Sequence, residues 1–473
     1  MNSNEIVEIN KQKNYIKKIK KHIDNIELKT GKKQKYFVFT TGCQMNAHES
    51  EKLSGILEEM GYVASDKEEN ADFVIYNTCC IRENAEDKIY GRLGRLKHYK
   101  NEKNKNMKIA LCGCMTQQDV VIQKLQQSYK YLDIVFGTFN IHKLPELLYT
   151  SLKSEETSTI FDIWKEHKEI VEDMPILREY KYKASVNIMF GCNNYCTYCI
   201  VPYVRGRERS RNYKDIIFEI ENLVSDGVKE ITLLGQNVNS YGKNLENPIT
   251  FAQLLNKINN IKGLERIRFM TSHPKDLSDE LIETIKNCNK VCKYIHLPIQ
   301  SGSTKILKKM NRGYTKENYI ELINKIKDSI PNIMISTDII VGFPGETEED
   351  FQDTLDIIKK VKFSNAFTFI YSKRTGTPAA TMTEQIPENI IKDRFDRLLN
   401  VLNPIINEIN NKQVGKIYDI LVEDISKQDE NILTGRADNN SIVHFKGKKE
   451  LIGNIVKVRI VDNKTFYLIG ERI

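Results

Sequence analysis

The chain has 473 residues and a formal net charge of +8, with 40% hydrophobic and 28% charged residues. These fractions are typical of a folded globular protein of two to four domains, and they exclude a mainly disordered chain. Residues 1–6 lack the basic and then apolar pattern of an export signal, and no apolar run is long enough to cross a bilayer. We therefore expect a cytoplasmic protein without a membrane partner, in which the ten cysteines stay reduced.

Most of the positive charge lies in residues 1–35, a basic N-terminal extension that holds ten Lys and four Asp or Glu. A basic arm of this kind can bind phosphate groups. The same composition is also typical of a solvated, poorly ordered extension. Both interpretations stay open, because the segment carries no chemical motif.

Residues 36–150 contain three short apolar runs, and each of them leads to a cysteine. The runs cover residues 36–40, 73–76 and 108–111, and the cysteines are Cys43, Cys79 and Cys114. Their spacing is about one β–α–β unit, which predicts a parallel α/β domain. Because sites in such sheets form beyond the carboxyl ends of the strands, the three cysteines would converge on one cluster site. The alternative is three ordinary buried cysteines.

Residues 151–183 are expected to form a linker between domains. Residues 154–159 show no apolar periodicity, and Pro175 follows them. The only tryptophan, Trp164, lies in this segment, and we expect it to pack against a neighbouring domain.

The central region, residues 184–405, opens with a strand and then a loop that holds Cys192, Cys196 and Cys199. Thiolates are the usual ligands of iron–sulfur clusters, and three of them leave one iron of a four-iron cluster open for another ligand. No further cysteine follows until Cys288. Zinc usually takes four ligands and disulfides are rare in the cytosol, so both alternatives fit this spacing less well than a [4Fe–4S] cluster.

Apolar strand candidates alternate with helices six times in this region, which predicts a partial α/β barrel. The strands are expected at residues 184–190, 230–234, 266–269, 294–297, 333–340 and 366–370, with helices such as 213–224 and 351–361 between them. Barrel enzymes carry their active-site residues on the loops after the strands. Polar and glycine-rich residues on these loops are typical of a cofactor site. The residues concerned are Gln236, Asn237, Gln300, Ser301, Gly302, Gly342 and Gly345.

Four arginines follow the cysteine loop: Arg205, Arg207, Arg209 and Arg211. They could pair with a carboxylate of the cofactor or with phosphates of an RNA. The alternative is a solvated basic face. The sequence does not tell which of the four contacts a ligand.

Two histidines and four further cysteines carry weaker signals. His273 and His296 lie next to strand ends and could contact the substrate or move a proton, although a lone histidine there is more often structural. The roles of four cysteines stay open: Cys80, Cys112, Cys288 and Cys292. The first two neighbour candidate ligands and are interpreted as spectators, and packing is expected for the last two.

Short alternating apolar segments replace helices in residues 408–473, at 417–422, 441–445, 453–460 and 465–470. Several short strands with turns between them predict a small β-barrel. Barrels of this size often bind single-stranded or looped RNA. Because this segment is not strongly basic, a capping domain without a ligand is the alternative.

Motifs in all three regions resemble the radical S-adenosylmethionine (SAM) methylthiotransferase family. The Cys-x-x-x-Cys-x-x-Cys spacing resembles radical SAM enzymes, and residues 41–46, 77–83 and 113–114 resemble the N-terminal methylthiotransferase domain. Residues 192–208 are similar to the tRNA-modifying branch of the family. Residues 435–438 and the strands around them are similar to the TRAM domain, an RNA-binding module. Cys80 and Thr116 replace smaller residues of the family pattern without removing a ligand.

The resemblance implies two [4Fe–4S] clusters and SAM as cofactors. It assigns Cys43, Cys79 and Cys114 to an auxiliary cluster that serves sulfur insertion. It assigns Cys192, Cys196 and Cys199 to a cluster whose open iron SAM chelates. The seven polar and glycine loop residues are expected to contact SAM because of their joint position on loops after the strands. In that family one electron cleaves SAM to methionine and a 5′-deoxyadenosyl radical, so no catalytic side chain beyond the cluster ligands is required.

The resemblance also implies the substrate and partners. The tRNA-modifying branch adds a methylthio group to C2 of N6-isopentenyladenosine next to the anticodon, so the partners would be the tRNA anticodon loop and an electron donor such as flavodoxin or ferredoxin. Two alternatives share the architecture: methylthiotransferases of threonylcarbamoyl-adenosine in tRNA and of a ribosomal-protein aspartate. An iron–sulfur RNA-binding redox sensor is the alternative outside the enzymes.

Overall fold

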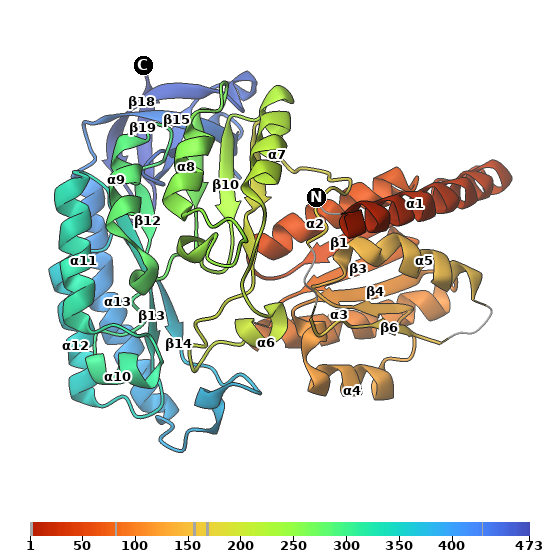
Figure 1. Cartoon of the computed structure of the whole chain (residues 1–473), viewed down its shortest axis with the longest axis horizontal. Helices are drawn as coiled ribbons and strands as arrows, with labels where there is room; N and C mark the ends of the chain where they lie inside the picture. The colour runs from red at the N-terminus through yellow and green to blue at the C-terminus, as the bar shows by residue number, and fades with distance from the viewer. Residues whose placement is uncertain (1–2, 81–82, 155–157, 167–169, 428) are drawn as a thin grey trace. The chain divides into compact units, whose positions relative to one another are not determined.

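The computed structural model describes residues 3–80, 83–154, 158–166, 170–427 and 429–473, and the chain divides into two compact units (Figure 1). The first unit holds residues 1–179, 190–193 and 200–212, and the second holds residues 180–189, 194–199 and 213–473. The cysteine loop at 192–199 therefore contributes residues to both units. Among the described helices, none combines the length and the apolar character that crossing a bilayer requires.

The first unit is a parallel α/β domain, as the sequence predicts. Its six strands lie in the order β2-β1-β3-β4-β5-β6, and all neighbouring pairs are parallel. Successive residues of β3 face opposite sides of the sheet: Phe73 and Ile75 join the core formed with α1, α2 and α5, whereas Val74 and Tyr76 join the core formed with α3 and α4. The strands are β1 (Lys35–Thr40), β2 (Val63–Ala64), β3 (Phe73–Thr78), β4 (Lys108–Gly113), β5 (Ile134–Phe136) and β6 (Ile160–Asp162). The helices are α1 (Ser3–Thr30), α2 (Gln44–Glu59), α3 (Glu83–Glu102), α4 (Asp119–Ser128), α5 (Leu144–Lys153) and α6 (Val201–Arg205).

The basic N-terminal extension is a long helix and not a poorly ordered arm. Helix α1 runs over Ser3–Thr30 and buries Ile16, Ile19 and Ile23 in the same core as α2 and α5. These isoleucines recur at a spacing of three and four residues, which places them on one helical face between the lysines. The periodicity decides the structure here, whereas overall composition suggested disorder.

The expected linker is partly built into the first sheet. Strand β6 (Ile160–Asp162) lies at residues 160–162 and pairs in parallel with β5. Trp164 packs on this domain, because its Nε1 donates to Asp162 Oδ1 at 2.8 Å and the Lys143 ammonium lies 5.0 Å from its ring centre. The prediction that the tryptophan packs against a domain is confirmed. The strand was not expected because only three residues form it, too few for a periodic pattern.

The second unit contains the predicted partial barrel. Six parallel strands form two three-stranded sheets, β11-β10-β7 and β12-β13-β14, and an isolated bridge between Ile267 and Val291 links β11 to the segment before β12. The strands are β7 (Lys183–Asn187), β10 (Glu230–Leu234), β11 (Arg266–Phe269), β12 (Tyr294–His296), β13 (Met334–Val341) and β14 (Asn365–Ile370). The expected first strand is divided, because β8 (Met189–Phe190) leaves the barrel after Ile188.

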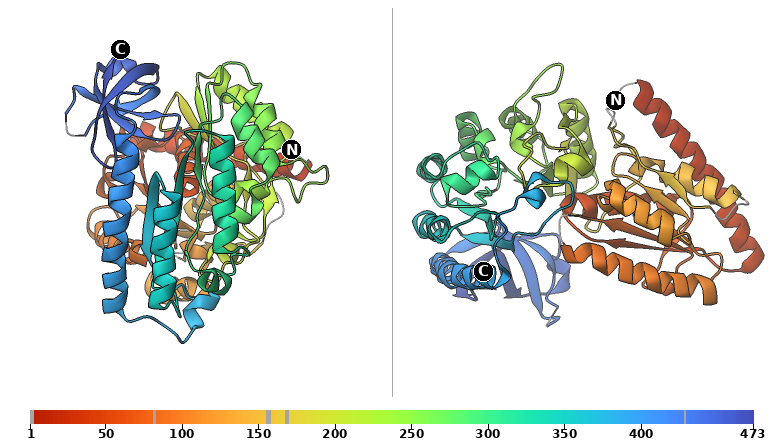
Figure 2. Two further views of the ribbon diagram at one scale, coloured as in Figure 1. Left: turned by 90° about the vertical axis from the view of Figure 1, so that its left-hand side faces the viewer. Right: turned by 90° about the horizontal axis from the view of Figure 1, so that it is seen from below.

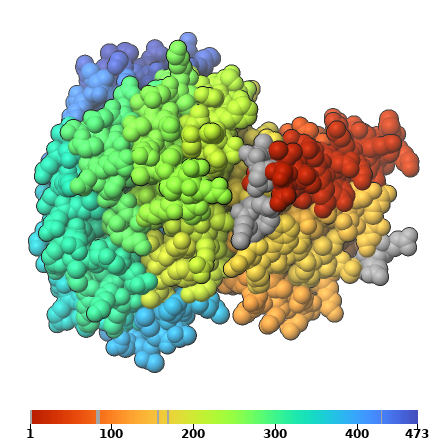
Figure 3. Space-filling model, viewed as in Figure 1, coloured from red at the N-terminus to blue at the C-terminus, as the bar shows by residue number. Residues whose placement is uncertain are grey.

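Helices form the outer layer of this barrel. They are α7 (Tyr213–Ser225), α8 (Phe251–Asn259), α9 (Asp279–Asn287), α10 (Thr304–Lys309), α11 (Lys316–Ser329), α12 (Glu348–Val361) and α13 (Glu388–Asn411). Seen from below, they make an arc outside the strands (Figure 2, right). The space-filling view shows the green and teal helices as a continuous layer on one face (Figure 3). The carboxyl ends of the strands are left to carry the functional loops.

The C-terminal region closes into a barrel of five strands with the order β15-β16-β17-β19-β18, which confirms the predicted small β-barrel; β16 lies outside the four expected segments. Its strands are β15 (Ile417–Ile425), β16 (Ile432–Ala437), β17 (Ile442–Lys446), β18 (Ile455–Asn463) and β19 (Leu468–Arg472). The long helix α13 leads into it (Figure 2, left). Because every strand is paired on both sides, the barrel presents no open edge.

Two arginines of β11 attach this barrel to the partial barrel. Arg266 donates to the carbonyl oxygens of Arg436 and Asp419 at 2.8 and 2.5 Å. Arg268 donates to that of Ala437 at 2.7 Å, and it forms an ion pair with the buried Glu230 at 2.9 Å. These charge-assisted bonds fix the small barrel to the edge of the larger one.

We predict that Arg268→Met destabilises the second unit by roughly 3–5 kcal/mol, because it leaves the buried Glu230 without its closest cation. Thermal unfolding of the purified apo-protein measures the effect. The control is Lys457→Met, which breaks an ion pair with Asp419 at the protein surface and should cost less than about 1 kcal/mol. Equal melting temperatures for the two variants would contradict the attachment by Arg268.

Candidate iron–sulfur and cofactor sites

Three cysteines lie at the carboxyl edge of the first unit's sheet. Cys43, Cys79 and Cys114 follow β1, β3 and β4, which are neighbours in that sheet. A Cβ on Gly42 would lie only 3.0 Å from Cys79 Sγ, so this glycine allows the loops of Cys43 and Cys79 to approach. The structure thus brings the predicted residues to one edge, and their ligation of a cluster stays a prediction.

Polar and charged groups surround these sulfurs. Asn46 Oδ1 lies 3.3 Å from Cys43 Sγ, and Arg205 Nε lies 3.2 Å from Cys114 Sγ. Loss of hydration among its neighbours raises the pKa of the Cys43 thiol, although its side chain is exposed at the surface. A hydrogen bond with Cys80, together with the charge of Arg205, lowers the pKa of Cys114. Lowering this pKa favours the thiolate, which is the form that binds metal.

The two other cysteines of this unit differ from each other. Cys112 is fully buried in the domain core, as expected for a spectator. Cys80 is buried beside Cys114, Ile200 and Val204, and its hydrogen bond with Cys114 raises the pKa of the Cys80 thiol. Cys80 is therefore a direct neighbour of the candidate site. Residues 81 and 82, which belong to the family motif, lie outside the described residues.

The second cysteine loop is held by main-chain bonds. In the first unit, the Cys192 amide donates to the carbonyl oxygen of Gly206 at 3.1 Å. In the second unit, the Cys199 amide donates to the carbonyl oxygen of Cys196 at 2.9 Å, and the Thr197 amide donates to that of Met310 at 3.1 Å. The Cys192 main chain is thus fixed within the first unit, and the Cys196–Cys199 turn is fixed within the second.

Arg312 is a site residue that the sequence analysis missed. Its Nη1 lies 3.4 Å from Cys196 Sγ, while its Nη2 donates to the carbonyl oxygen of Pro298 at 2.8 Å and its Nε to the Tyr314 hydroxyl at 2.9 Å. The sequence carries no signal for this role; in the structure the residues on both sides of Arg312, Asn311 and Gly313, have positive φ. A positive charge beside a candidate ligand stabilises its thiolate.

The donor sets fit iron–sulfur clusters better than a mononuclear metal. Within the described ranges, no group of three or more Cys, His, Asp or Glu side chains is arranged to hold a single metal ion. A cubane cluster binds each cysteine through a different iron, so its ligands need not meet at one point. Each predicted site offers three thiols with a buried arginine beside one of them, a set that suits an anionic cluster.

Buried polar atoms at the carboxyl ends of β10 and β11 are left without protein partners. In the part of the chain that the structure describes, Asn237 Oδ1, Asn239 Oδ1, Ser272 Oγ and His273 Nε2 are buried and accept or donate no hydrogen bond. Such a group costs roughly 1–3 kcal/mol when it stays unsatisfied. A ligand with amino, hydroxyl and carboxylate groups would satisfy these atoms, and SAM has all three.

Three of the eight described non-glycine residues with positive φ lie on loops that follow strands of this region. Tyr195, Thr271 and Gln300 have φ values of 47°, 66° and 75°, a region that side chains other than glycine rarely adopt. They lie on the loops after β8, β11 and β12. Strain of this kind costs on the order of 1–3 kcal/mol per residue and clusters at functional sites.

The first two predicted SAM residues lie on the loop that also carries the unsatisfied oxygens of Asn237 and Asn239. Gln236 and Asn237 follow β10, and Asn237 Nδ2 donates to Asp276 Oδ2 at 2.7 Å. This bond leaves the Asn237 carbonyl oxygen as the unsatisfied atom. Gln300 lies on the strained loop after β12, and its amide donates to the carbonyl oxygen of Asp338 at 2.9 Å.

The remaining predicted residues have close contacts with the fold itself. A Cβ on Gly302 would lie 2.4 Å from the carbonyl oxygen of Asp353 in α12, and the buried Ser301 contacts the same helix. The Gly342 amide donates to Glu346 Oε1 at 3.1 Å. The Gly345 amide donates to the carbonyl oxygen of Glu384 at 2.8 Å. Packing therefore accounts for these four residues, and their contact with SAM stays a prediction.

The two histidines are separated by their environments. Both ring nitrogens of His296 face partners, Ser336 Oγ at 2.8 Å and Asp338 Oδ1 at 3.4 Å. Burial, with Arg312 nearby, lowers the pKa of His273 to about 2, so His273 is neutral near pH 7. Its Nε2 is one of the unsatisfied atoms, which makes His273 the better candidate for a ligand contact. Cys288 packs in the barrel core as expected, and Cys292 is also buried.

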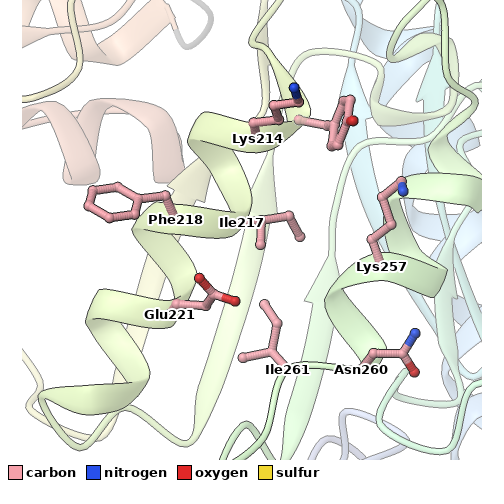
Figure 4. Close-up of a pocket in the computed structure, with 8 residues that line it drawn as sticks. Lys214, Ile217, Phe218, Glu221, Lys257, Asn260 and Ile261 are labelled. Atoms are coloured by element: carbon pink, nitrogen blue, oxygen red, sulfur yellow. The ribbon is translucent and has the colours of Figure 1, made fainter.

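A surface hollow of about 370 Å³ lies between α7 and α8 (Figure 4). Its lining includes the exposed Phe218 and the charged Lys214, Glu221 and Lys257. The hollow is on the outer helical layer, whereas the unsatisfied atoms lie on the loops after β10 and β11. It is therefore separate from the candidate cofactor site.

Models of three families match the chain. The Radical SAM superfamily matches residues 186–358, the Uncharacterized protein family UPF0004 matches 35–137, and the TRAM domain matches 411–473. Among solved structures, a radical S-adenosylmethionine methyltransferase, TsrM, from Kitasatospora setae is 13% identical with a TM-score of 0.53, covering 73% of this chain and 77% of that one. The cobalamin-dependent S-adenosylmethionine radical enzyme OxsB is 15% identical with a TM-score of 0.52, covering 79% and 56%. Fold and family models together define the chain as a radical SAM enzyme.

Curated relatives narrow this class. A tRNA-2-methylthio-N(6)-dimethylallyladenosine synthase of Lachnoclostridium phytofermentans is 58% identical, covering 96% of this chain and 98% of the relative. Enzymes of the same name from Acetivibrio thermocellus and Clostridioides difficile are each 55% identical over 98% of this chain, which corresponds to 96% and 97% of their own lengths. The chain belongs to the tRNA-2-methylthio-N(6)-dimethylallyladenosine synthase family, whose cofactors are SAM and [4Fe–4S] clusters.

We predict that His273 makes the second unit acid-sensitive. The folded-state pKa is depressed to about 2, so the neutral histidine supports the fold above the unfolded pKa of about 6.5. As the pH falls from 6.5 to 5, stability should decline by roughly 1.4 kcal/mol per pH unit. Denaturant unfolding of the apo-protein should show this slope in the wild type and a reduced slope in His273→Gln.

The matched control is His98→Gln, which removes an exposed histidine that pairs with Glu102. It should keep the wild-type slope. An unchanged slope in His273→Gln would contradict the neutral buried state of His273.

Proposed function

We propose that this chain is the enzyme that adds a methylthio group to C2 of N6-isopentenyladenosine next to the anticodon in tRNA. The observation that carries the proposal is the 58% identity, over 96% of the chain, to a relative of this name. The alternatives with threonylcarbamoyl-adenosine or a ribosomal-protein aspartate as substrate have weaker support, since the near relatives at 53–58% identity all carry the tRNA dimethylallyladenosine name.

Each group of residues has a role in this reaction. Cys43, Cys79 and Cys114 would hold an auxiliary cluster, and Cys192, Cys196 and Cys199 the cluster that receives SAM. When bound, the clusters and SAM supply the sulfur and radical chemistry that an adenine C2–H, neither acidic nor electrophilic, requires. The unsatisfied atoms after β10 and β11 would orient the amino and carboxylate groups of SAM, and Arg312 would hold the Cys196 sulfur in place.

The domains divide this work in the proposal. Residues 36–150, with α1 attached, carry the auxiliary site, residues 184–405 the SAM site, and residues 408–473 contact RNA. The exposed aromatic rings of Phe466 and Tyr467 support the last assignment, because aromatic rings stack on unpaired bases. An anticodon-loop base is cheaper to splay out than a paired base.

A low-potential electron donor such as flavodoxin or ferredoxin completes the proposed reaction. One-electron reduction of the SAM-binding cluster needs a donor of this kind, and small redox proteins of the cytoplasm provide it. We also propose a cytoplasmic location, because tRNA and reduced thiols are both found in that compartment.

The test is an anaerobic reaction of reconstituted, reduced protein with SAM and tRNA that bears isopentenyladenosine, followed by nucleoside mass spectrometry. We expect 2-methylthio-N6-isopentenyladenosine and 5′-deoxyadenosine from the wild type. Replacing Cys192, Cys196 and Cys199 by Ala should abolish both products, since no radical can form. Replacing Cys43, Cys79 and Cys114 by Ala should keep 5′-deoxyadenosine formation and abolish methylthiolation.

The same assay with tRNA that bears threonylcarbamoyl-adenosine separates the nearest alternative. Methylthiolation of that tRNA alone would reassign the substrate. A protein that holds both clusters and forms neither product would contradict the enzyme assignment and favour a redox sensor.

A further inference from the structure

The four arginines after the cysteine loop have different surroundings, and one of them is enclosed. Arg207 is exposed, whereas Arg205 is only 4% exposed. The Arg209 guanidinium lies 4.9 Å from the ring centre of Phe139, and Arg211 lies 4.0 Å from Glu172. Arg205 contacts a candidate cluster ligand, because its Nε lies 3.2 Å from Cys114 Sγ.

The Arg205 guanidinium lies between the Glu49 carboxylate and the Cys114 thiol. Its Nη1 and Nη2 both contact the Glu49 carboxylate, with Nη2 at 3.1 Å from Oε2. Its Nε points to Cys114 Sγ at 3.2 Å, and its Nη2 also lies 3.3 Å from Asn46 Oδ1. Because that oxygen is 3.3 Å from Cys43 Sγ, Arg205 reaches two of the three candidate ligands, one directly and one through Asn46.

The main chain beside Arg205 contacts the other cysteine loop. The Gly206 carbonyl oxygen accepts a hydrogen bond from the Cys192 amide at 3.1 Å. A Cβ on Gly191 would lie 2.0 Å from the carbonyl oxygen of Arg207, so the backbone at Gly191 is in close contact with the backbone at Arg207. The segment 205–207 therefore fixes the Cys192 main chain and the Cys114 side chain at once.

The burial of this ion pair requires an explanation beyond stability. A buried Arg–Glu pair is often no more stabilising than apolar residues of the same volume, because both charges lose their hydration. Glu49 is 4% exposed, and Asn46 is fully buried. Both terminal nitrogens of the Arg205 guanidinium contact Glu49, so they cannot form a bidentate ion pair with a SAM carboxylate or an RNA phosphate. Its Nε is directed at the Cys114 sulfur.

We propose that Arg205 is a positioning residue for the auxiliary cluster: it holds the Cys114 sulfur and, with its charge moderated by Glu49, raises the reduction potential of that cluster. The inference rests on the proposed assignment of Cys43, Cys79 and Cys114 as ligands. Hydrogen bonds to ligand sulfur and the net charge around a cluster set its potential. A cation beside the sulfur stabilises the reduced form, which carries one more negative charge, and an anion opposes this.

The test is a redox titration of reconstituted full-length protein, followed by electron paramagnetic resonance. A background with Cys192, Cys196 and Cys199 replaced by Ala identifies the auxiliary signal. Arg205→Gln should shift the auxiliary potential to more negative values, and Glu49→Gln should shift it to more positive values. Arg205→Lys keeps the charge without the fork and should lie between the wild type and Arg205→Gln.

Two further measurements separate this role from a packing role. Arg205→Gln should bind the auxiliary iron about 10–100-fold more weakly in competition with a chelator, the usual loss of affinity when a group that orients a ligand is removed. Arg207→Gln removes an exposed charge two residues away and should leave the auxiliary potential unchanged, because solvent screens it.

The outcomes are distinct. Opposite shifts in Arg205→Gln and Glu49→Gln support the proposal. An auxiliary signal that stays unmoved in both variants, or is lost from both and from Arg205→Lys, would overturn the role of Arg205 and leave the ligand assignment intact. Wild-type protein without an auxiliary signal, with about four irons per chain in place of eight, would overturn the ligand assignment itself.

Discussion

Parallel pairing places the carboxyl ends of neighbouring strands along one edge of a sheet, and each unit of this protein depends on that constraint. In the first unit it gathers Cys43, Cys79 and Cys114, which lie 36 and 35 residues apart in the chain. In the second unit it gathers the unsatisfied atoms after β10 and β11 and the strained residues after β11 and β12. The parallel direction of the strands thus brings residues that are far apart in the chain to one edge of a sheet.

A buried arginine stands beside one cysteine at each candidate cluster site. Arg205 contacts Cys114 in the first unit, and Arg312 contacts Cys196 in the second. The two differ in their other partners: Glu49 neutralises Arg205, whereas Arg312 is held by the uncharged Pro298 carbonyl and Tyr314 hydroxyl. An arginine therefore gives the two candidate cluster sites different electrostatic surroundings. The charge next to a cluster influences its reduction potential.

The small C-terminal barrel is attached to the partial barrel by main-chain acceptors. Arg266 and Arg268 bind carbonyl oxygens of β15 and β16, and Lys183 adds an ion pair with the Glu423 side chain at 3.1 Å. Among its aromatic residues, Phe466 and Tyr467 stay exposed.

Periodicity and spacing were sufficient to predict the parallel domain, the six strands of the partial barrel and the closed C-terminal barrel, because each depends on local patterns of apolar residues. They failed for α1, where lysines obscured the apolar face, and for β6, which is too short to show a pattern. Cysteine spacing likewise identified six candidate ligands, since strand ends and loops can be placed from sequence.

What the sequence could not decide is which charged residue meets which sulfur. Arg205 was one of four equivalent arginines in the sequence, and Arg312 carried no signal of its own. Only the packing of α2, the strand ends and the segment after the cysteine loop encloses Arg205 with Glu49 and Cys114. Local patterns determine where strands begin and end, whereas contacts between side chains far apart in the chain exist only once the tertiary structure has formed.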